Sequence, residues 1–249
     1  MLALAREKLA TACNNQAPCM PVITVVFICL SQTWCWAGLA VIALSLIARL
    51  QAISQAKLST MGFDNWQHGW CQAAKKCESP NFGPRPSSAQ IDLLVIHSIS
   101  LPPGEFGNGA VQKLFTNQLD WNAHPYFQAI RGLEVSSHFF IERTGQIWQF
   151  VSCDDRAWHA GASSYRGRSN CNDDSIGIEL EGLEGHLFET AQYDSLAQLC
   201  LGLGKQYPIS HIAGHEHIAP NRKKDPGPGF DWALLKKNVA WPHQYFPEI

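Results

Sequence analysis

Hydrophobic and polar positions along most of the chain follow strand-like and helix-like patterns in turn. Residues 91–98 (IDLLVIHS) form an almost continuous apolar run with β-branched side chains, which predicts a strand buried on both faces. Residues 137–142 and 146–151 flank an Arg-Thr-Gly turn and predict a hairpin. Residues 111–119 have the pattern of a short helix. These alternating patterns predict an α/β fold.

Residues 176–182 (IGIELEG) alternate apolar positions with Gly and Glu, which predicts a strand with one exposed face that carries Glu179. A helix is predicted over residues 190–207, with Thr190 as its N-cap. Its apolar stripe comprises Tyr193, Leu196, Ala197, Cys200 and Leu203. Residues 209–215 predict a last strand. The predicted architecture is a central mixed β-sheet flanked by helices, and the pattern leaves the strand order open.

The N-terminal part has a different composition. Residues 22–48 contain no charged side chain, and this stretch exceeds the ~20 residues that span a bilayer core. Lys and Arg flank it on both sides, so its orientation is undetermined. It is interpreted as a membrane anchor, as a mis-assigned start with Met61 as the true one, or as a hydrophobic helical hairpin. The predicted organisation is a hydrophobic extension over 1–60 and a soluble domain over 61–249.

The net charge of −2 and the pI near 6.5 give no electrostatic reason to expect nucleic acid as a partner. The nine cysteines are odd in number and contain no C-x-x-C pair. They therefore fit neither a disulfide framework nor a zinc ribbon and are predicted to be mostly reduced thiols. Cys153, Cys171 and Cys200 are predicted to be small buried side chains.

Three candidate metal ligands lie at the ends of predicted elements. His97 and His215 each close a strand, and Asp225 follows in a rigid Asp-Pro-Gly-Pro sequence, where Pro226 restricts its backbone. Two imidazoles and one carboxylate are a known catalytic zinc set. With ten histidines in the chain, this spacing alone does not select one set.

Four motifs, at residues 93–107, 156–168, 171–182 and 214–232, resemble in order those of the AmpD-type N-acetylmuramoyl-L-alanine amidases. These are the zinc-dependent, cytoplasmic branch of the fold shared with peptidoglycan recognition proteins. The resemblance runs from about residue 66 to about residue 240. It implies hydrolysis of the amide between N-acetylmuramic acid, in its 1,6-anhydro form, and L-alanine of the stem peptide.

The resemblance also implies a role for each matching position. His97, His215 and Asp225 match the ligands of one zinc ion per chain. Glu179 matches the general acid/base, and Lys223 matches a cation that stabilises the transition state. Taken alone, Glu179 and Lys223 also fit ordinary solvated surface residues.

Four further residues are candidates for substrate binding, namely Trp158, His159, Arg222 and Leu180. Trp158 and His159 fit a substrate wall and fit a packed core equally well. The expected partner is an anhydro-muropeptide, with a membrane involved only if residues 22–48 are a real anchor. A cytoplasmic monomer is expected, and anchoring in the inner membrane is the alternative.

Three positions depart from the family pattern. Ser98 and Glu134 stand where asparagine and a carboxylate-binding arginine are expected, and Asn170 replaces a basic residue. These departures leave open the preference for the anhydro sugar and the affinity for an anionic stem peptide. The alternative functions are a membrane-anchored amidase acting on intact peptidoglycan, a non-catalytic muropeptide-binding module, and another metallohydrolase.

Overall fold

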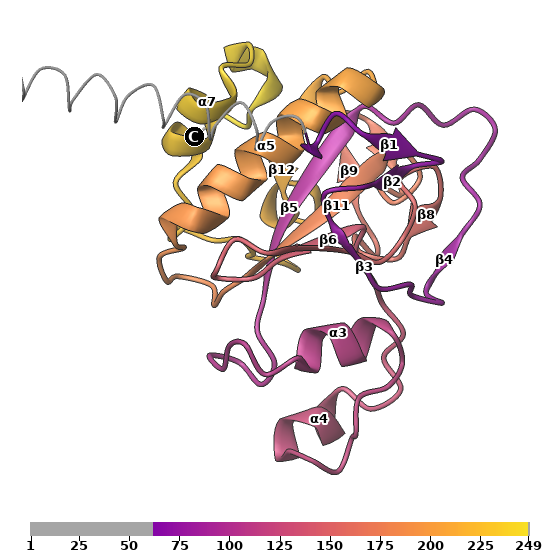
Figure 1. The fold of residues 1–249 in the computed structure, drawn as a ribbon, viewed down its shortest axis with the longest axis vertical. Coiled ribbons are helices and arrows are strands. Elements are labelled where there is room, and N and C mark those ends of the chain that lie inside the picture. Colours follow the sequence, from indigo (N-terminus) through magenta and orange to yellow (C-terminus); the bar gives the residue numbers. More distant parts are fainter. Residues whose placement is uncertain (1–61, 249) are drawn as a thin grey trace, which may run out of the picture. The chain divides into compact units, whose positions relative to one another are not determined.

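The computed structural model describes residues 62–248, and their centre is a six-stranded sheet of order β12-β5-β11-β6-β7-β3 (Figure 1). The strands are β3 (Lys75–Lys76), β5 (Leu93–Ile99), β6 (Phe139–Ile141), β7 (Ile147–Gln149), β11 (Ser175–Glu181) and β12 (His211–Gly214). β5 runs parallel to β11 and β12, whereas β6 and β7 are antiparallel. The predicted mixed sheet and the predicted hairpin are therefore confirmed.

Three two-stranded ribbons lie outside this sheet. They pair β1 (Trp66–Gln67) with β2 (Trp70–Cys71), β4 (Phe82–Gly83) with β8 (Arg156–Ala157), and β9 (Ser164–Tyr165) with β10 (Arg168–Ser169).

The strands β5 and β11 form the spine of the sheet. Their parallel register pairs His97 with Glu179 and Val95 with Gly177, so each pair points to the same face. Every position of β11 is buried. The prediction that one face of this strand is exposed was wrong, because distant loops cover that side, as where the backbone N–H groups of Gly107 and Arg143 contact Glu181.

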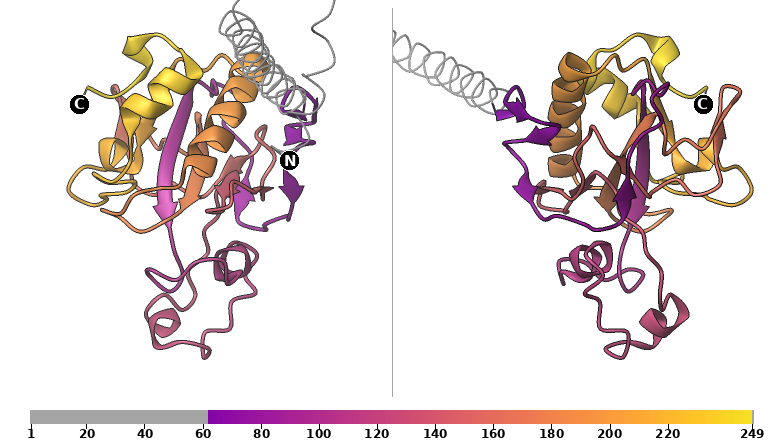
Figure 2. Two further views of the ribbon diagram at one scale, coloured as in Figure 1. Left: turned by 60° about the vertical axis from the view of Figure 1, so that its left-hand side comes forward. Right: turned by 90° about the vertical axis from the view of Figure 1, so that its right-hand side faces the viewer.

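The helices α5 (Thr190–Gln206) and α7 (Trp232–Val239) pack on the opposite face of the sheet (Figure 2). All five residues of the predicted apolar stripe of α5 are buried. The prediction of Thr190 as N-cap was wrong by one residue. Glu189 holds that place, and its backbone N–H donates to the side chain of Gln192 at 3.0 Å.

Two short helices, α3 (Ala110–Phe115) and α4 (Pro125–Ala129), follow the carboxyl end of β5 (Figure 1). α3 ends before the predicted boundary, since Asn117 has a φ of 58° that no right-handed helix continues. The remaining short elements are α6 (His215–Ile218) and η1 (His243–Tyr245).

Within residues 62–248, no helix has the length and apolar character that crossing a bilayer requires. The predicted extension at 1–60, with its uncharged stretch at 22–48, lies outside the described residues. The five cysteines of the described part are free thiols, and Cys153, Cys171 and Cys200 are buried as predicted.

Candidate functional site

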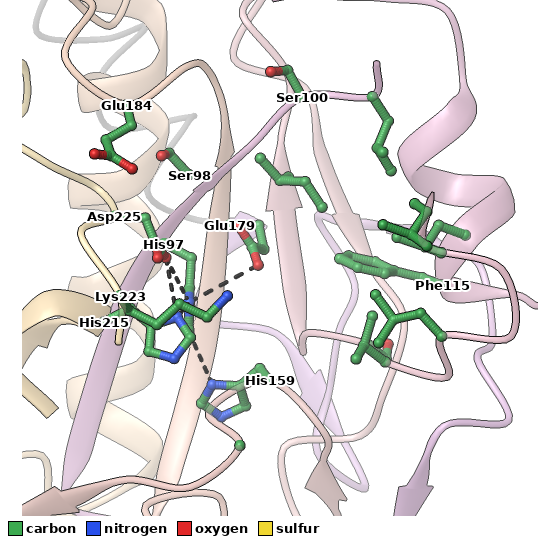
Figure 3. Close-up of a pocket in the computed structure, with 18 of the residues that line it drawn as sticks. His97, Ser98, Ser100, Phe115, His159, Glu179, Glu184, His215, Lys223 and Asp225 are labelled. Carbon is green, nitrogen blue, oxygen red and sulfur yellow. Dashed lines mark hydrogen bonds and ion pairs between the residues drawn. The ribbon is translucent and has the colours of Figure 1, made fainter. Parts of the chain in front are cut away.

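Three donor atoms meet at the carboxyl end of the parallel strands (Figure 3). Nδ1 of His97 lies 2.9 Å from Nδ1 of His215 and 3.2 Å from Oδ2 of Asp225. The distance between Nδ1 of His215 and Oδ2 of Asp225 is 3.1 Å, so the three atoms form a donor triangle. Ligands about 2.0–2.2 Å from one zinc ion have separations close to these. The structure thus brings the three predicted ligands together in a group that could hold a metal ion.

The chemistry of this donor set also fits a cation. Nε2 of His215 lies 3.1 Å from the carbonyl oxygen of Ala160. A carbonyl only accepts, so Nε2 carries the hydrogen and Nδ1 presents a lone pair to the centre. Burial, and then the nearby charge of His215, lower the pKa of His97 to about 4, so this ring is neutral near neutral pH.

Asp225 is held beside the histidines by its backbone. Its carbonyl accepts from the N–H of Glu216 at 2.9 Å. A Cβ on Gly214 would lie 2.8 Å from Cδ of Pro226, so glycine is required for this approach of the loop. Burial alone would raise the pKa of Asp225, but the contacts of its carboxylate with His215 and His97 outweigh this effect and keep the carboxyl ionised.

Glu179 lies beside the three donors, with Oε1 4.0 Å from Nδ1 of His97. Only 9% of the residue is exposed, and its Oε2 has no hydrogen-bond partner within the described part of the chain. Burial raises the pKa of Glu179 well above its usual range, the charge of Asp225 raises it further, and Lys223 opposes both. A carboxyl in such surroundings holds a proton more readily than an exposed glutamate does.

The two basic candidates have different contacts. Lys223 is exposed, and its amine points toward Glu179 at the cleft (Figure 3). The guanidinium of Arg222 donates to the carbonyl oxygens of Ala160 and Ala162, each at 2.7 Å. Arg222 therefore braces the loop that positions His215, while contact of Arg222 with a substrate stays a prediction.

The remaining candidates for substrate binding lie in three different environments. Trp158 is half-buried and lines the cleft. His159 also borders the cleft, but its ring nitrogens contact His97 Nε2 at 3.0 Å and Ser175 Oγ at 3.2 Å. Leu180 is fully buried in the core beneath α5. Since it alternates with Glu179, its side chain points to the other face of the sheet, and the structure does not support the predicted role of Leu180 in binding substrate.

A cleft of about 900 Å³ extends from the donor atoms to an apolar wall that the sequence patterns did not reveal. Phe115 lies across the cleft from His97 (Figure 3). The wall comprises Leu114, Phe115, Ile130, Leu133 and Val135. Leu114 and Phe115 lie in the helix predicted over 111–119, and Leu133 and Val135 flank Glu134 in a segment without periodicity, so no sequence pattern indicates that they face one cleft.

His138 lies behind the site and is fully buried. Its Nδ1 accepts from the N–H of Gly177 at 3.0 Å, and its Nε2 lies 3.1 Å from the carbonyl of Asp155. Burial, and then the charge of Arg85, lower the pKa of His138 from 6.5 to about 3. The folded protein therefore holds this ring in its neutral form.

The free energy of unfolding is expected to decrease as the pH falls below 6.5, because the unfolded chain binds a proton at His138 that the folded chain excludes down to about pH 3. By about pH 4.5 this residue alone lowers the free energy of unfolding by roughly 2–3 kcal/mol. The free energy of unfolding is measured with urea at pH 6.5 and at about pH 4.5. Its decrease between these two pH values should be smaller in His138→Gln than in the wild type, and unchanged in the exposed control His243→Gln. Equal pH dependence in all three proteins would contradict this assignment.

Comparison with known proteins gives a consistent result. The family model for N-acetylmuramoyl-L-alanine amidase matches residues 87–228, more than half of the chain. The 1,6-anhydro-N-acetylmuramyl-L-alanine amidase AmpD of Citrobacter freundii is 52% identical over 174 residues, which cover 69% of this chain and 93% of that protein. AmpD of Escherichia coli K12 is 50% identical over 176 residues, covering 70% and 96%.

The fold agrees as well. The crystal structure of the selenomethionine derivative of AmpD aligns with 70% of this chain and 99% of its own, with a TM-score of 0.69 and 50% sequence identity. The predicted amidase fold is thereby confirmed for the shared region. By sequence and by structure, the chain belongs to the family of N-acetylmuramoyl-L-alanine amidases.

Proposed function

We propose that this chain hydrolyses the amide bond between 1,6-anhydro-N-acetylmuramic acid and L-alanine of the stem peptide, as a zinc enzyme of peptidoglycan recycling. The observation that carries the proposal is the convergence of His97, His215 and Asp225 next to the buried carboxyl of Glu179. The relatives from Citrobacter freundii and Escherichia coli are named for this activity. When bound, a zinc ion supplies Lewis-acid chemistry, which polarises a carbonyl and makes water more acidic.

Glu179 is suited to move the proton that the reaction requires. Its Oε1, 4.0 Å from Nδ1 of His97, lies beside the donor atoms and is placed to accept a proton from the attacking water. The water oxygen then bonds to the carbonyl carbon, the C–N bond breaks, and Glu179 returns the proton to the leaving nitrogen of L-alanine. The products are the muramyl carboxylic acid and a peptide with a free amine. A raised pKa suits both halves of this transfer.

Lys223 supplies positive charge at the mouth of the same site. As the water oxygen adds, negative charge develops on the former carbonyl oxygen, and a cation placed there beforehand stabilises the transition state more than the substrate. The apolar wall opposite, which includes Phe115 and Leu133, offers a surface for the uncharged parts of a muropeptide.

The direct test is to incubate the full-length chain with anhydro-muropeptide and zinc, with and without a chelator, and to measure released peptide. Release that the chelator abolishes and added zinc restores supports the proposal. Binding of the muropeptide without release would instead support a non-catalytic binding module. Stoichiometric zinc with uncut muropeptide would support another metallohydrolase.

The location is proposed to be the cytoplasm, as is expected for a recycling enzyme. Cell fractionation with an activity assay tests it. Activity confined to the membrane fraction, together with cleavage of intact peptidoglycan, would favour the anchored alternative.

Lys223→Met is expected to lower kcat about 10²–10³-fold, in the range found when an oxyanion donor is removed, while zinc remains bound. It should also shift the acid limb of the pH–rate profile to higher pH. Lys223 holds the pKa of Glu179 down, so losing that charge raises the pKa and leaves the base protonated to higher pH. A pH–rate profile of both proteins checks this. A change in KM alone, with the acid limb unmoved, would limit Lys223 to substrate binding.

A further inference from the structure

Behind His97, a line of hydrogen-bonding groups leads away from the metal centre. Nε2 of His97 lies 3.0 Å from Nδ1 of His159, and Nε2 of His159 lies 3.2 Å from Oγ of Ser175. The hydroxyl of Ser175 donates to the backbone carbonyl of Cys171. His97, His159 and Ser175 are thus joined in sequence, and the line ends on an atom that only accepts.

That last atom sets the direction of every hydrogen bond before it. Because the hydroxyl hydrogen of Ser175 points to a carbonyl, its oxygen accepts from Nε2–H of His159. Neither ring partner of His159 is a carboxylate, so nothing compensates a charge and the ring is neutral. A neutral imidazole with hydrogen on Nε2 has a lone pair on Nδ1, which accepts from Nε2–H of His97.

We propose that His159 is a positioning residue of the metal centre, which fixes His97 in the tautomer whose Nδ1 lone pair faces the cation. This inference rests on the proposed function, because it concerns the metal affinity of the same site. It gives His159 a role that differs from the predicted substrate wall.

The ring of His159 is held in place from two directions. Oδ1 of the buried Asn172 accepts from the backbone N–H of His159 at 3.1 Å and from that of Ala160 at 2.8 Å. On the sheet side, a Cβ at Gly177 would lie 2.5 Å from the imidazole. Gly177 therefore leaves the space on β11 that the ring occupies, next to the position of Glu179.

The same loop acts on both histidine ligands. His159 receives the N–H of His97 through its side chain, and Ala160 receives the N–H of His215 through its carbonyl. His159 and Ala160 thereby direct the Nδ1 atoms of both histidine ligands to one point. Arg222 holds Ala160 in place by donating to its carbonyl oxygen. Outer partners of this kind set the orientation and basicity of metal ligands.

The test compares zinc dissociation constants, measured by competition with a chromophoric chelator, for the full-length wild type and three variants. His159→Leu removes the acceptor and is expected to weaken zinc binding about 10–100-fold. His159→Asn offers an amide oxygen where Nδ1 stood and should recover most of that loss. Gly177→Ala changes no polar group but displaces the ring, and should resemble His159→Leu.

A second measurement needs neither metal nor a variant. Nitrogen-15 NMR of the metal-free wild type is expected to show hydrogen on Nε2 of His97, the atom that faces His159. An Nε2 without hydrogen, or equal zinc affinity of His159→Leu and wild type, would overturn the inference and leave the proposed function intact. If the wild type bound no zinc and cut no muropeptide, the proposed function itself would fail.

Discussion

Asp225→Ala is expected to abolish stoichiometric zinc binding and reduce amidase activity to background, while the fold persists. The carboxylate supplies one of three donor atoms and the negative charge of the set. Two neutral imidazoles alone hold a divalent ion weakly, so the loss should exceed the ~10–100-fold that an outer partner costs. Asp225 belongs to none of the hydrophobic clusters, so the core is untouched.

Metal analysis of the purified variant, with circular dichroism to check the fold, measures this result. Glu184→Ala is the matched control, since Glu184 is an exposed carboxylate that lines the same cleft without joining the donor triangle. It should retain one zinc per chain. An Asp225→Ala protein that kept zinc at full occupancy would remove Asp225 from the ligand set.

Glu179→Gln is expected to lower kcat about 10²–10⁴-fold, the usual contribution of general acid–base catalysis, with zinc binding preserved. Glutamine has the same shape and lies in the same buried place, but it takes no proton from water and returns none to the leaving nitrogen. The pre-steady-state and steady-state rates of peptide release provide the measurement. A kcat within a few-fold of wild type would mean that another group carries the proton.

Glu181 offers the matched control, because it lies two residues along β11 on the same face and is also buried. Its carboxylate accepts from the backbone N–H of Gly107 at 2.5 Å and of Arg143 at 3.1 Å. Glu181→Gln replaces one of these accepting oxygens with an amide NH2 group, which would face a backbone N–H with no acceptor between them. It should lower the free energy of unfolding by about 1–3 kcal/mol and leave the rate of the chemical step nearly unchanged.

These two glutamates mark a limit of sequence patterns. Both alternate with apolar residues in the manner of solvent-facing positions, and both are buried. The alternation correctly places them on one face of β11. It does not reveal that a loop at Gly107 covers Glu181 or that the cleft encloses Glu179, because those coverings come from distant parts of the chain.

His159 and Arg222 illustrate the same limit in another way. Sequence motifs mark both as belonging to the site, and both lie there. Their partners are an imidazole 62 residues away and two backbone carbonyls 62 and 60 residues away. No local pattern contains such contacts, so the motif identifies the neighbourhood of these side chains and the folded chain decides what they touch.

The sequence by itself determined β5, β6, β7, β11, β12 and the helix α5, since continuous or periodic apolar runs can be buried in few ways. It also indicated the three donor residues, through their resemblance to the amidase motifs, because the spacing of the histidines alone selects no single set. Only the tertiary structure decided the strand order, the burial of Glu179, the core position of Leu180 and the apolar wall of the cleft. Those features depend on which distant segments pack together, and packing is a property of the whole folded domain.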